Sequence, residues 1–374
     1  MANVLACGIG IALIASVASA DFGAQAELGR ALFFDANLSR ARTQSCAQCH
    51  DPARGFSDAR DNGVGGAASR GGDGKSIHVR NTPGIAYAAY VPSFARAADG
   101  EYVGGLFHDG RARDLEEQAG QPILNPLEMA LPDVASVVER MRENPTYVRA
   151  FAAVHDAPVL DDDAQGFAAV RSALAAFQRT SFFATFDSRY DRYLAGEVAL
   201  TELEDAGRTF FFSSLTNCAS CHVEERAALG ARQLFTNFRY FNLGLPVNHA
   251  LNRAAGVGAP DPGLAASPGV TAPAQRGRFR VPSLRNVAVT APYMHNGVFR
   301  ELRTAVAFYN RYLVRNPNSH VNPETGAAWG DTEWPATVAH DLLRQGQPLT
   351  EARIDAIVAF LRALTDRRYE HLLE

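Results

Sequence analysis

A five-residue pattern, C-x-x-C-H, occurs twice in this chain and constrains its fold more than any other feature. Two cysteines three residues apart can bond to the two vinyl groups of one porphyrin, and the next histidine then lies under the iron as an axial ligand. The pattern therefore predicts two covalently attached c-type haems. The six residues that would hold them are Cys46, Cys49, His50, Cys218, Cys221 and His222.

Three other uses of paired cysteines fit the sequence less well. A disulfide or a redox C-x-x-C needs no histidine after it, and a zinc site would need further thiols or histidines at ligand spacing. The chain has five cysteines, and the four that follow Cys7 all belong to the two motifs. A chance origin is also unfavourable, because the same five-residue pattern occurs twice.

The first 20 residues are expected to be a signal peptide. Residues 4–20 form an apolar run that ends in A-S-A, a typical cleavage site before Asp21, although no Lys or Arg precedes the run. The alternative is an N-terminal membrane anchor, for which the run is short. No later stretch is apolar enough to span a membrane. Export to the periplasm agrees with the motifs, because c-type haems are attached outside the bacterial cytoplasm.

Charge excludes one class of partner. The net charge is −4, and Lys75 is the only lysine among 36 basic residues. Nothing in the sequence resembles the basic face of a nucleic-acid-binding protein. We therefore expect no nucleic-acid partner.

The chain contains an internal repeat. E-L-G-R-A-L-F-F at residues 27–34 precedes the first motif, and D-A-G-R-T-F-F-F at residues 205–212 precedes the second. R-N-T-P and F-H-D-G in the first half also have counterparts in R-V-P-S-L-R-N and Y-M-H-N-G in the second. Self-similarity on this scale indicates two copies of one haem-binding unit. We expect domains at residues 21–190 and 191–374.

Periodicity makes the expected fold mostly α, with two tandem cytochrome c-like domains, each binding one haem. Apolar residues at helical spacing predict helices at residues 27–34, 133–154, 164–186 and 350–364, and another from Leu115 to near Pro122. Residues 125–129 are expected to form a turn. Stretches rich in glycine or proline predict loops at residues 55–76 and 256–275.

Seven further motifs identify a family. G-R-A-L-F-F-D, C-A-Q-C-H-D-P, R-N-T-P, D-G-R-A-R-D-L-E-E-Q, N-P-L-E-M, V-P-S-L-R-N-V and P-Y-M-H-N-G occur in this order. With them the chain resembles the bacterial di-haem cytochrome c peroxidase superfamily, which includes MauG, over residues 25–370. The resemblance implies a peroxide-reactive N-terminal haem and an electron-transfer C-terminal haem.

The resemblance also implies the residues around the first haem. Gln118 and Glu128 match the distal glutamine and glutamate of the family, and Glu128 would move a proton between the two peroxide oxygens. A cap or ion pair at the surface is the alternative for Glu128. His108 stands where the family usually has an interhaem tryptophan, so it could weaken coupling between the haems or be a satisfied polar residue. His78 is a candidate distal ligand or an ordinary loop histidine.

The relatives hold a calcium ion between the haems, partly through backbone oxygens. The matching positions in this chain are Asn81, Thr290 and Pro292. Carbonyl and amide oxygens suit a hard cation. The resemblance therefore implies one Ca²⁺.

The sixth ligand of the second haem separates the subclasses. The peroxidases have a methionine fourteen residues after the histidine of P-Y-x-H, whereas this chain has Tyr309 at that distance from His295, as MauG does. A tyrosine oxygen favours oxidised iron, and a methionine thioether favours ferrous iron. The alternative is Tyr309 as a core aromatic, with Met294 or another group as ligand.

The resemblance implies a periplasmic, MauG-like, peroxide-dependent oxidase. Hydrogen peroxide would produce a high-valent bis-Fe(IV) state that oxidises a side chain, such as tryptophan, of a periplasmic partner protein. One alternative is a cytochrome c peroxidase that takes electrons from a small cytochrome or cupredoxin. The other is a non-enzymatic di-haem electron carrier, which would need no acid–base residue near an iron.

Overall fold

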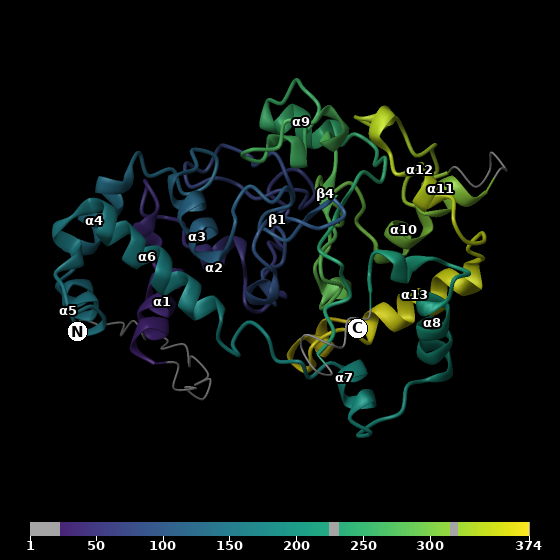
Figure 1. Ribbon diagram of the computed structural model, residues 1–374, viewed down its shortest axis with the longest axis horizontal. Helices are drawn as coiled ribbons and strands as arrows, with labels where there is room; N and C mark the ends of the chain where they lie inside the picture. Colours follow the sequence, from purple (N-terminus) through teal and green to yellow (C-terminus); the bar gives the residue numbers. More distant parts are fainter. Residues whose placement is uncertain (1–22, 224–231, 315–320, 374) are drawn as a thin grey trace, which may run out of the picture.

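The computed structural model describes residues 23–223, 232–314 and 321–373. The expected signal peptide, residues 1–20, lies outside these ranges. The first and second halves of the chain lie side by side, at the left and right of Figure 1, and the segment after α6 leads from one to the other. Within the described residues, no helix has both the length and the apolar character needed to cross a bilayer.

The fold is mostly helical, with long loops between the helices. The helices of the first half are α1 (Ala24–Phe34), α2 (Cys46–Cys49), α3 (Leu115–Leu124), α4 (Val134–Arg142), α5 (Pro145–Val154) and α6 (Asp163–Gln178). Those of the second half are α7 (Arg189–Leu194), α8 (Glu202–Phe212), α9 (His249–Ala255), α10 (Leu302–Ala307), α11 (Asn310–Leu313), α12 (His340–Leu343) and α13 (Glu351–Arg362).

The strands are short and form two antiparallel pairs. β1 (Ala95–Arg96) pairs with β2 (Tyr102–Val103), and β3 (Tyr240–Phe241) pairs with β4 (Phe279–Arg280). In register, Ala95 lies opposite Val103 and Tyr240 lies opposite Arg280. These pairs join loops rather than form a core sheet.

Each half is built on one close helix pair. In the first half α1 packs against α6, and in the second α8 packs against α13. A Cβ atom on Gly29 would lie 1.9 Å from the carbonyl oxygen of Ala173, and one on Gly207 would lie 1.8 Å from that of Ala356. Both glycines belong to the G-R-x-x-F-F repeats, so the repeated sequence codes for the same helix contact in each half.

The two halves have separate apolar cores. One cluster of buried side chains draws on residues 28–183, and another on residues 190–364. Phe33, Phe177 and Phe183 pack edge to face in the first cluster, and Phe360 lies among Tyr190, Phe211 and Phe235 in the second. The domain limits of 21–190 and 191–374 stay predictions.

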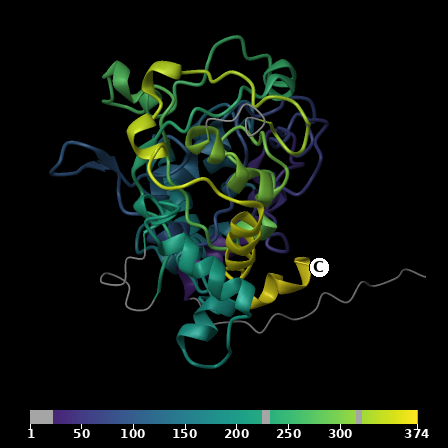
Figure 2. The ribbon, with the colours of Figure 1, turned by 90° about the vertical axis from the view of Figure 1, so that its right-hand side faces the viewer.

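Buried polar contacts join the halves. Tyr87 donates a 2.5 Å hydrogen bond to Asp366, and the guanidinium of Arg80 pairs with Asp109 of its own half and Asp261 of the other. After α13 (yellow in Figure 1) the chain runs back toward the first half, where the Tyr369 hydroxyl donates to the carbonyl of Pro52. Figure 2 shows the same C-terminal segment in yellow from the side of the second half. The C-terminal segment therefore fastens the second half to the first.

Three expected helices differ in their limits. Residues 133–154 form two helices rather than one, because Asn144 accepts a hydrogen bond from the Thr146 N–H and Pro145 begins α5. The helix expected at 164–186 ends at Gln178. Helix α3 continues past Pro122 to Leu124. The closing helix is confirmed, since Thr350 caps α13 by accepting from the Arg353 N–H.

Candidate haem and peroxide sites

Both C-x-x-C-H motifs line one continuous cavity of about 480 Å³ between the two halves. Its walls are mainly apolar and aromatic, which suits a porphyrin face. All the site residues expected from the sequence lie on this wall. They are Cys46, Cys49, His50, Asn81, His108, Gln118, Glu128, Cys218, Cys221, His222, Thr290, Pro292 and Tyr309.

The first motif forms the short helix α2 and ends at His50. The Ser45 N–H donates to the side chain of Gln48, which closes the first turn of this helix. The Nδ1 atom of His50 lies 3.2 Å from the carbonyl oxygen of Phe56. An Nδ1–H directed at a carbonyl fixes the tautomer and leaves Nε2 free to bind iron.

The second motif repeats this arrangement. Cys218–Ser220 form one 3₁₀ turn, and Nδ1 of His222 lies 2.8 Å from the carbonyl oxygen of Phe235. Burial lowers the pKa of His222 to about 4. Its imidazole is therefore neutral at neutral pH, as iron ligation requires.

The thiols fit thioether-linked haems. No disulfide joins Cys46, Cys49, Cys218 or Cys221, and each is only partly buried because it faces the cavity. Burial raises the pKa of all four thiols, that of Cys46 to about 12. A thioether carries no charge, so attachment to haem suits these apolar positions. The donor set at each motif therefore fits a c-type haem.

Glu128 lies in the turn that follows α3, as the N-P-L-E-M motif predicts. The Asn125 side chain shapes this turn, since its oxygen accepts from the Leu127 N–H and its amide donates to Glu128 Oε1 at 3.0 Å. Gln118 lies on α3, whose first turn is capped by Asp114. The turn brings Glu128 back to the same cavity wall as Gln118. Glu128 is partly buried at this position, and its acid–base role stays a prediction.

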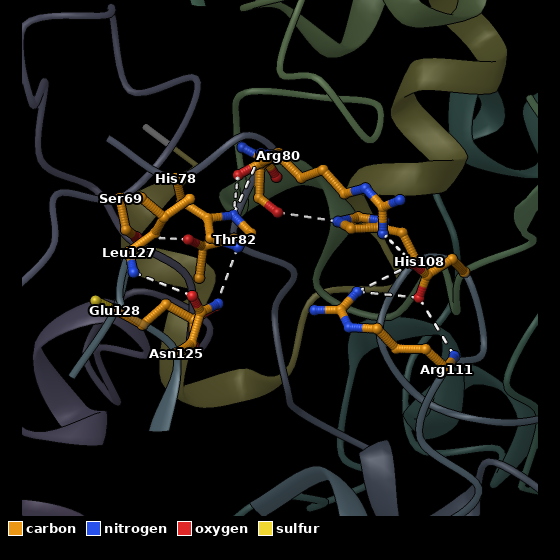
Figure 3. A network of polar contacts seen from close by, with 12 residues as sticks. Ser69, His78, Arg80, Thr82, His108, Arg111, Asn125, Leu127 and Glu128 are labelled. Carbon is orange, nitrogen blue, oxygen red and sulfur yellow. Dashed lines mark hydrogen bonds and ion pairs between the residues drawn. The ribbon is translucent and has the colours of Figure 1, made fainter. Parts of the chain in front are cut away.

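Glu128 also contacts His78, at 3.1 Å between Nε2 and Oε1 (Figure 3). Burial would raise the pKa of Glu128, but the hydrogen bond and charge of His78, followed by the charges of Arg111 and His50, outweigh burial and lower it. The carboxylate is therefore ionised at neutral pH. An ionised carboxylate in a largely apolar cavity can accept a proton from a bound peroxide.

His108 is held by a backbone contact. Its Nε2 lies 2.9 Å from the carbonyl oxygen of Asn81, and its own carbonyl accepts from the Arg280 N–H. Burial lowers the pKa of His108 to about 4, so the ring is neutral. This geometry agrees with a satisfied polar residue that joins the two halves, and its part in coupling the haems stays a prediction.

Tyr309 lies between α10 and α11 on the wall near the second motif. Its pKa is raised, mainly by burial and next by the Cys221 and Cys218 thiols. The side chain is half-buried because it faces the cavity. Met294, the alternative ligand, lines the same cavity, so ligation by Tyr309 stays a prediction.

Comparison with known proteins decides the family. A family model described as di-haem cytochrome c peroxidase matches residues 23–199. The methylamine utilization protein MauG of Paracoccus denitrificans is 54% identical over 353 residues, which cover 94% of this chain and 91% of that protein. The chain belongs to the di-haem cytochrome c peroxidase family.

Solved structures of this family share the fold. The diheme peroxidase BthA from Burkholderia thailandensis has a TM-score of 0.80 and 33% identity, covering 92% of this chain and 86% of that one. A MauG-like protein associated with microbial copper homeostasis has a TM-score of 0.67 and 32% identity, with 92% of both chains covered. The family confirms the tandem cytochrome c-like fold, the two c-type haems and a haem-dependent oxidoreductase that acts with peroxide.

The calcium site expected from the family stays a prediction. The Asn81 N–H donates to the carbonyl oxygen of His295, in the segment that also carries Thr290 and Pro292, and all three residues line the cavity. Among the described residues, no group of three or more His, Cys, Asp or Glu side chains is arranged to hold a metal ion. A site built from backbone and amide oxygens would leave no such group.

Two contributors to the site were not foreseen. The sequence suggested His78 as an iron ligand or a loop histidine, whereas its ring contacts Glu128. Asn125 was placed in a turn, but its hydrogen bond to Glu128 was not predicted. The Asn125-Pro126 pair signals the turn itself, because an asparagine at the start of a turn often accepts a hydrogen bond from the backbone two residues later, as Asn125 does from Leu127.

Proposed function

We propose that this chain is a periplasmic oxidase of the MauG type, which uses hydrogen peroxide to oxidise a side chain, such as tryptophan, of a periplasmic partner protein. The observation that carries the proposal is the position of the Glu128 carboxylate, in contact with His78 and on the lining of the cavity that both haem motifs share. The name of the relative from Paracoccus links that protein to methylamine utilization. The oxidised partner of this chain is proposed only by class, as a protein side chain.

Glu128 would be the acid–base residue of the peroxide reaction. When bound at His50, the haem supplies the iron at which peroxide is reduced. Glu128 would accept a proton from one oxygen of the peroxide and return it to the other, and this proton transfer would allow the O–O bond to break with release of water. Gln118, on the same wall, would orient the peroxide through its side-chain amide.

Tyr309 would favour the oxidase over the peroxidase. A phenolate oxygen is a hard ligand that stabilises oxidised iron, so a haem bound by His222 and Tyr309 would hold an oxidising equivalent better than an electron. A peroxidase that draws electrons from a small cytochrome or cupredoxin needs a second haem that holds an electron better than an oxidising equivalent. The neutral His108 would then separate the haems without adding charge.

Three further assignments belong to this proposal. Residues 1–20 would direct export and be removed, after which no membrane-spanning segment is expected. Residues 21–190 would carry the peroxide-reactive haem, and residues 191–374 the electron-transfer haem. Asn81, Thr290 and Pro292 would hold one Ca²⁺ between them.

The test is a titration of the fully ferric holoprotein with one equivalent of peroxide, followed by EPR and Mössbauer spectroscopy. We expect rapid loss of both ferric signals without prior reduction. A reaction that begins only after one haem is reduced would instead identify a cytochrome c peroxidase. No reaction in either state would leave a di-haem electron carrier.

A further inference from the structure

His78 occupies a defined place beside Glu128. Its N–H donates to the carbonyl of Ser69, and Arg70 and Ile77 pair as an antiparallel bridge within the same loop. Ser69 and Thr82 share a 2.5 Å hydrogen bond across the base of the loop. This hairpin, residues 69–78, therefore fixes the backbone position of His78, and Figure 3 shows Ser69, Thr82 and His78.

The same hairpin is fastened directly to the Glu128 turn. The Gly72 N–H donates a 2.7 Å hydrogen bond to the backbone carbonyl of Glu128. A Cβ atom on Gly71 would lie 2.8 Å from the carbonyl oxygen of Leu127, so the absence of a side chain permits this close approach. The hairpin thus contacts Glu128 through its backbone as well as through His78.

Hydrogen-bond partners define the proton position on the His78 ring. The Arg80 N–H lies 3.2 Å from Nδ1, and a backbone N–H can only donate. In the neutral ring Nδ1 is then the acceptor, and the proton lies on Nε2, directed at Glu128. The Arg80 carbonyl, also 3.2 Å from Nδ1, would accept from a protonated ring. In both protonation states, Nε2–H donates to the carboxylate.

The hydrogen bonds to Glu128 divide its two oxygens. In the described part of the chain, both polar contacts with the carboxylate end on Oε1: His78 Nε2 lies 3.1 Å from it, and Asn125 Nδ2 donates to it at 3.0 Å. Two donors on one oxygen fix the orientation of the carboxylate and stabilise its charge. Oε2 is left as the oxygen available to a molecule in the cavity.

We propose that His78 is a positioning residue for the peroxide reaction, whose Nε2–H holds Oε1 of Glu128 and leaves Oε2 to act as the base. The inference rests on the proposed acid–base role of Glu128 and adds the group that controls it. It differs from the interpretation of His78 as an iron ligand, because Nε2 of His78 contacts Glu128 at 3.1 Å, and the experiment below separates the two roles.

The consequence is a shifted pH dependence when the donor is removed. Burial acts to raise the pKa of Glu128, and His78 provides the largest opposing contribution. The other ionisable groups that act on Glu128 are Arg111, His50 and the Cys46 thiol. Once Cys46 is attached to haem it is a thioether and no longer ionises. Without His78 the pKa of Glu128 is therefore higher, so the carboxyl stays protonated to higher pH. Over that added pH range Glu128 cannot act as the base.

Cyanide binding to the ferric holoprotein tests this inference without a partner protein or turnover. Hydrogen cyanide must lose its proton to bind iron as cyanide, so the binding rate constant depends on an ionised base. We expect His78→Leu to move the acid limb of the rate profile up by about one pH unit, which lowers the rate constant on that limb roughly tenfold. His78→Gln, which keeps an N–H donor, should return the limb close to its wild-type position.

Controls separate the possible roles of His78. His249→Leu removes an exposed histidine at the start of α9 and should leave the profile unchanged. His78→Phe keeps a ring without the donor and should behave as His78→Leu does, so it replaces that variant if His78→Leu takes up haem poorly. The ferric EPR spectrum should be the same in all variants.

Several results would overturn the inference. Equal profiles for wild type and His78→Leu would remove the role of His78, and so would a His78→Gln profile that matches His78→Leu. Faster cyanide binding with a new ferric EPR signal in His78→Leu would identify His78 as an iron ligand. Failure of the wild-type protein to bind cyanide at any pH would instead contradict the open haem of the proposed function itself.

Discussion

At the scale of single residues, local hydrogen bonds and charges prepare the side chains that line the mainly apolar cavity. Burial acts to raise the pKa of Glu128, but the contact and charge of His78, followed by the charges of Arg111 and His50, lower it. His50 and His222 are each oriented by a carbonyl oxygen, which leaves Nε2 for the iron. The local hydrogen bonds therefore set the protonation state of the base and the tautomers of both proximal ligands.

Replacing Glu128 by Gln should remove the base and keep the shape. We expect the rate constant for reaction of the ferric protein with peroxide to fall by about 10² to 10⁴-fold, the usual contribution of a positioned acid–base group. Stopped-flow absorbance measures it. Glu139→Gln, at an exposed position of α4, is the matched control and should react as wild type. Unchanged kinetics in Glu128→Gln would contradict the assignment.

Replacing Tyr309 by Met should raise the reduction potential of the second haem. A thioether favours ferrous iron more than a phenolate oxygen does. Spectroelectrochemical titration of the holoprotein measures the potential, and Tyr309→Phe is the control that removes the oxygen without adding sulfur. If neither substitution changed the potential, Tyr309 would be a core aromatic and Met294 the next candidate ligand.

At the scale of elements, each haem motif follows a helix that packs very closely against a second helix. At the glycine of this contact there is no space for a side chain. The carbonyls of Ala173 in α6 and Ala356 in α13 lie where a Cβ atom of Gly29 or Gly207 would be. A close approach of this kind brings α1 and α8 near the helices that close each core, and each motif follows shortly after. The repeated glycine thus positions the same helix pair in both halves.

Replacing Gly29 by Ala should destabilise the first half. A Cβ atom 1.9 Å from a backbone oxygen forces the helices apart, which we expect to cost about 3 kcal/mol or more in free energy of unfolding. Denaturant unfolding of the holoprotein measures the change. Gly258→Ala is the control, since no atom lies within 4 Å of its Cβ position, and it should be near neutral. Equal stabilities would show that the helices can separate freely.

At the scale of the whole molecule, buried charges cross the boundary between the halves. Arg80 of the first half donates to Asp261 of the second at 2.6 and 2.7 Å. Burial would raise the pKa of Asp261, but the hydrogen bonds and charge of Arg80 lower it to about 2. Because the carboxylate stabilises the fold only when ionised, this contribution is present above about pH 4 and is lost as the pH falls toward 2.

Replacing Asp261 by Asn should therefore destabilise the protein in a pH-dependent way. We expect a loss of roughly 2 kcal/mol in the free energy of unfolding at pH 7 and little difference from wild type near pH 2. Arg80 keeps Asp109 as a partner, so its charge is not left unpaired. Asp156→Asn, at an exposed position, is the control. A difference that stayed constant with pH would contradict the ion-pair explanation.

The sequence was sufficient wherever chemistry requires a fixed local spacing. Two cysteines, one histidine and the glycine-containing repeats before them led to the haems, the helical fold and the two-unit organisation. Helix limits were less predictable, as at Asn144 and Pro145, where the end of one helix and the start of the next lie within an amphipathic pattern that continues through both. Periodicity alone does not show such an interruption.

The amino-acid sequence by itself therefore determined which haems this chain attaches, because thioether chemistry and axial ligation are encoded within five consecutive residues. Only the tertiary structure decided which groups control the peroxide site. His78 and Glu128 are fifty residues apart in the chain, and they meet because the hairpin at residues 69–78 bonds to the Glu128 turn. A contact between two segments that are distant in the chain depends on how both segments pack, so the sequence of neither segment alone predicts it.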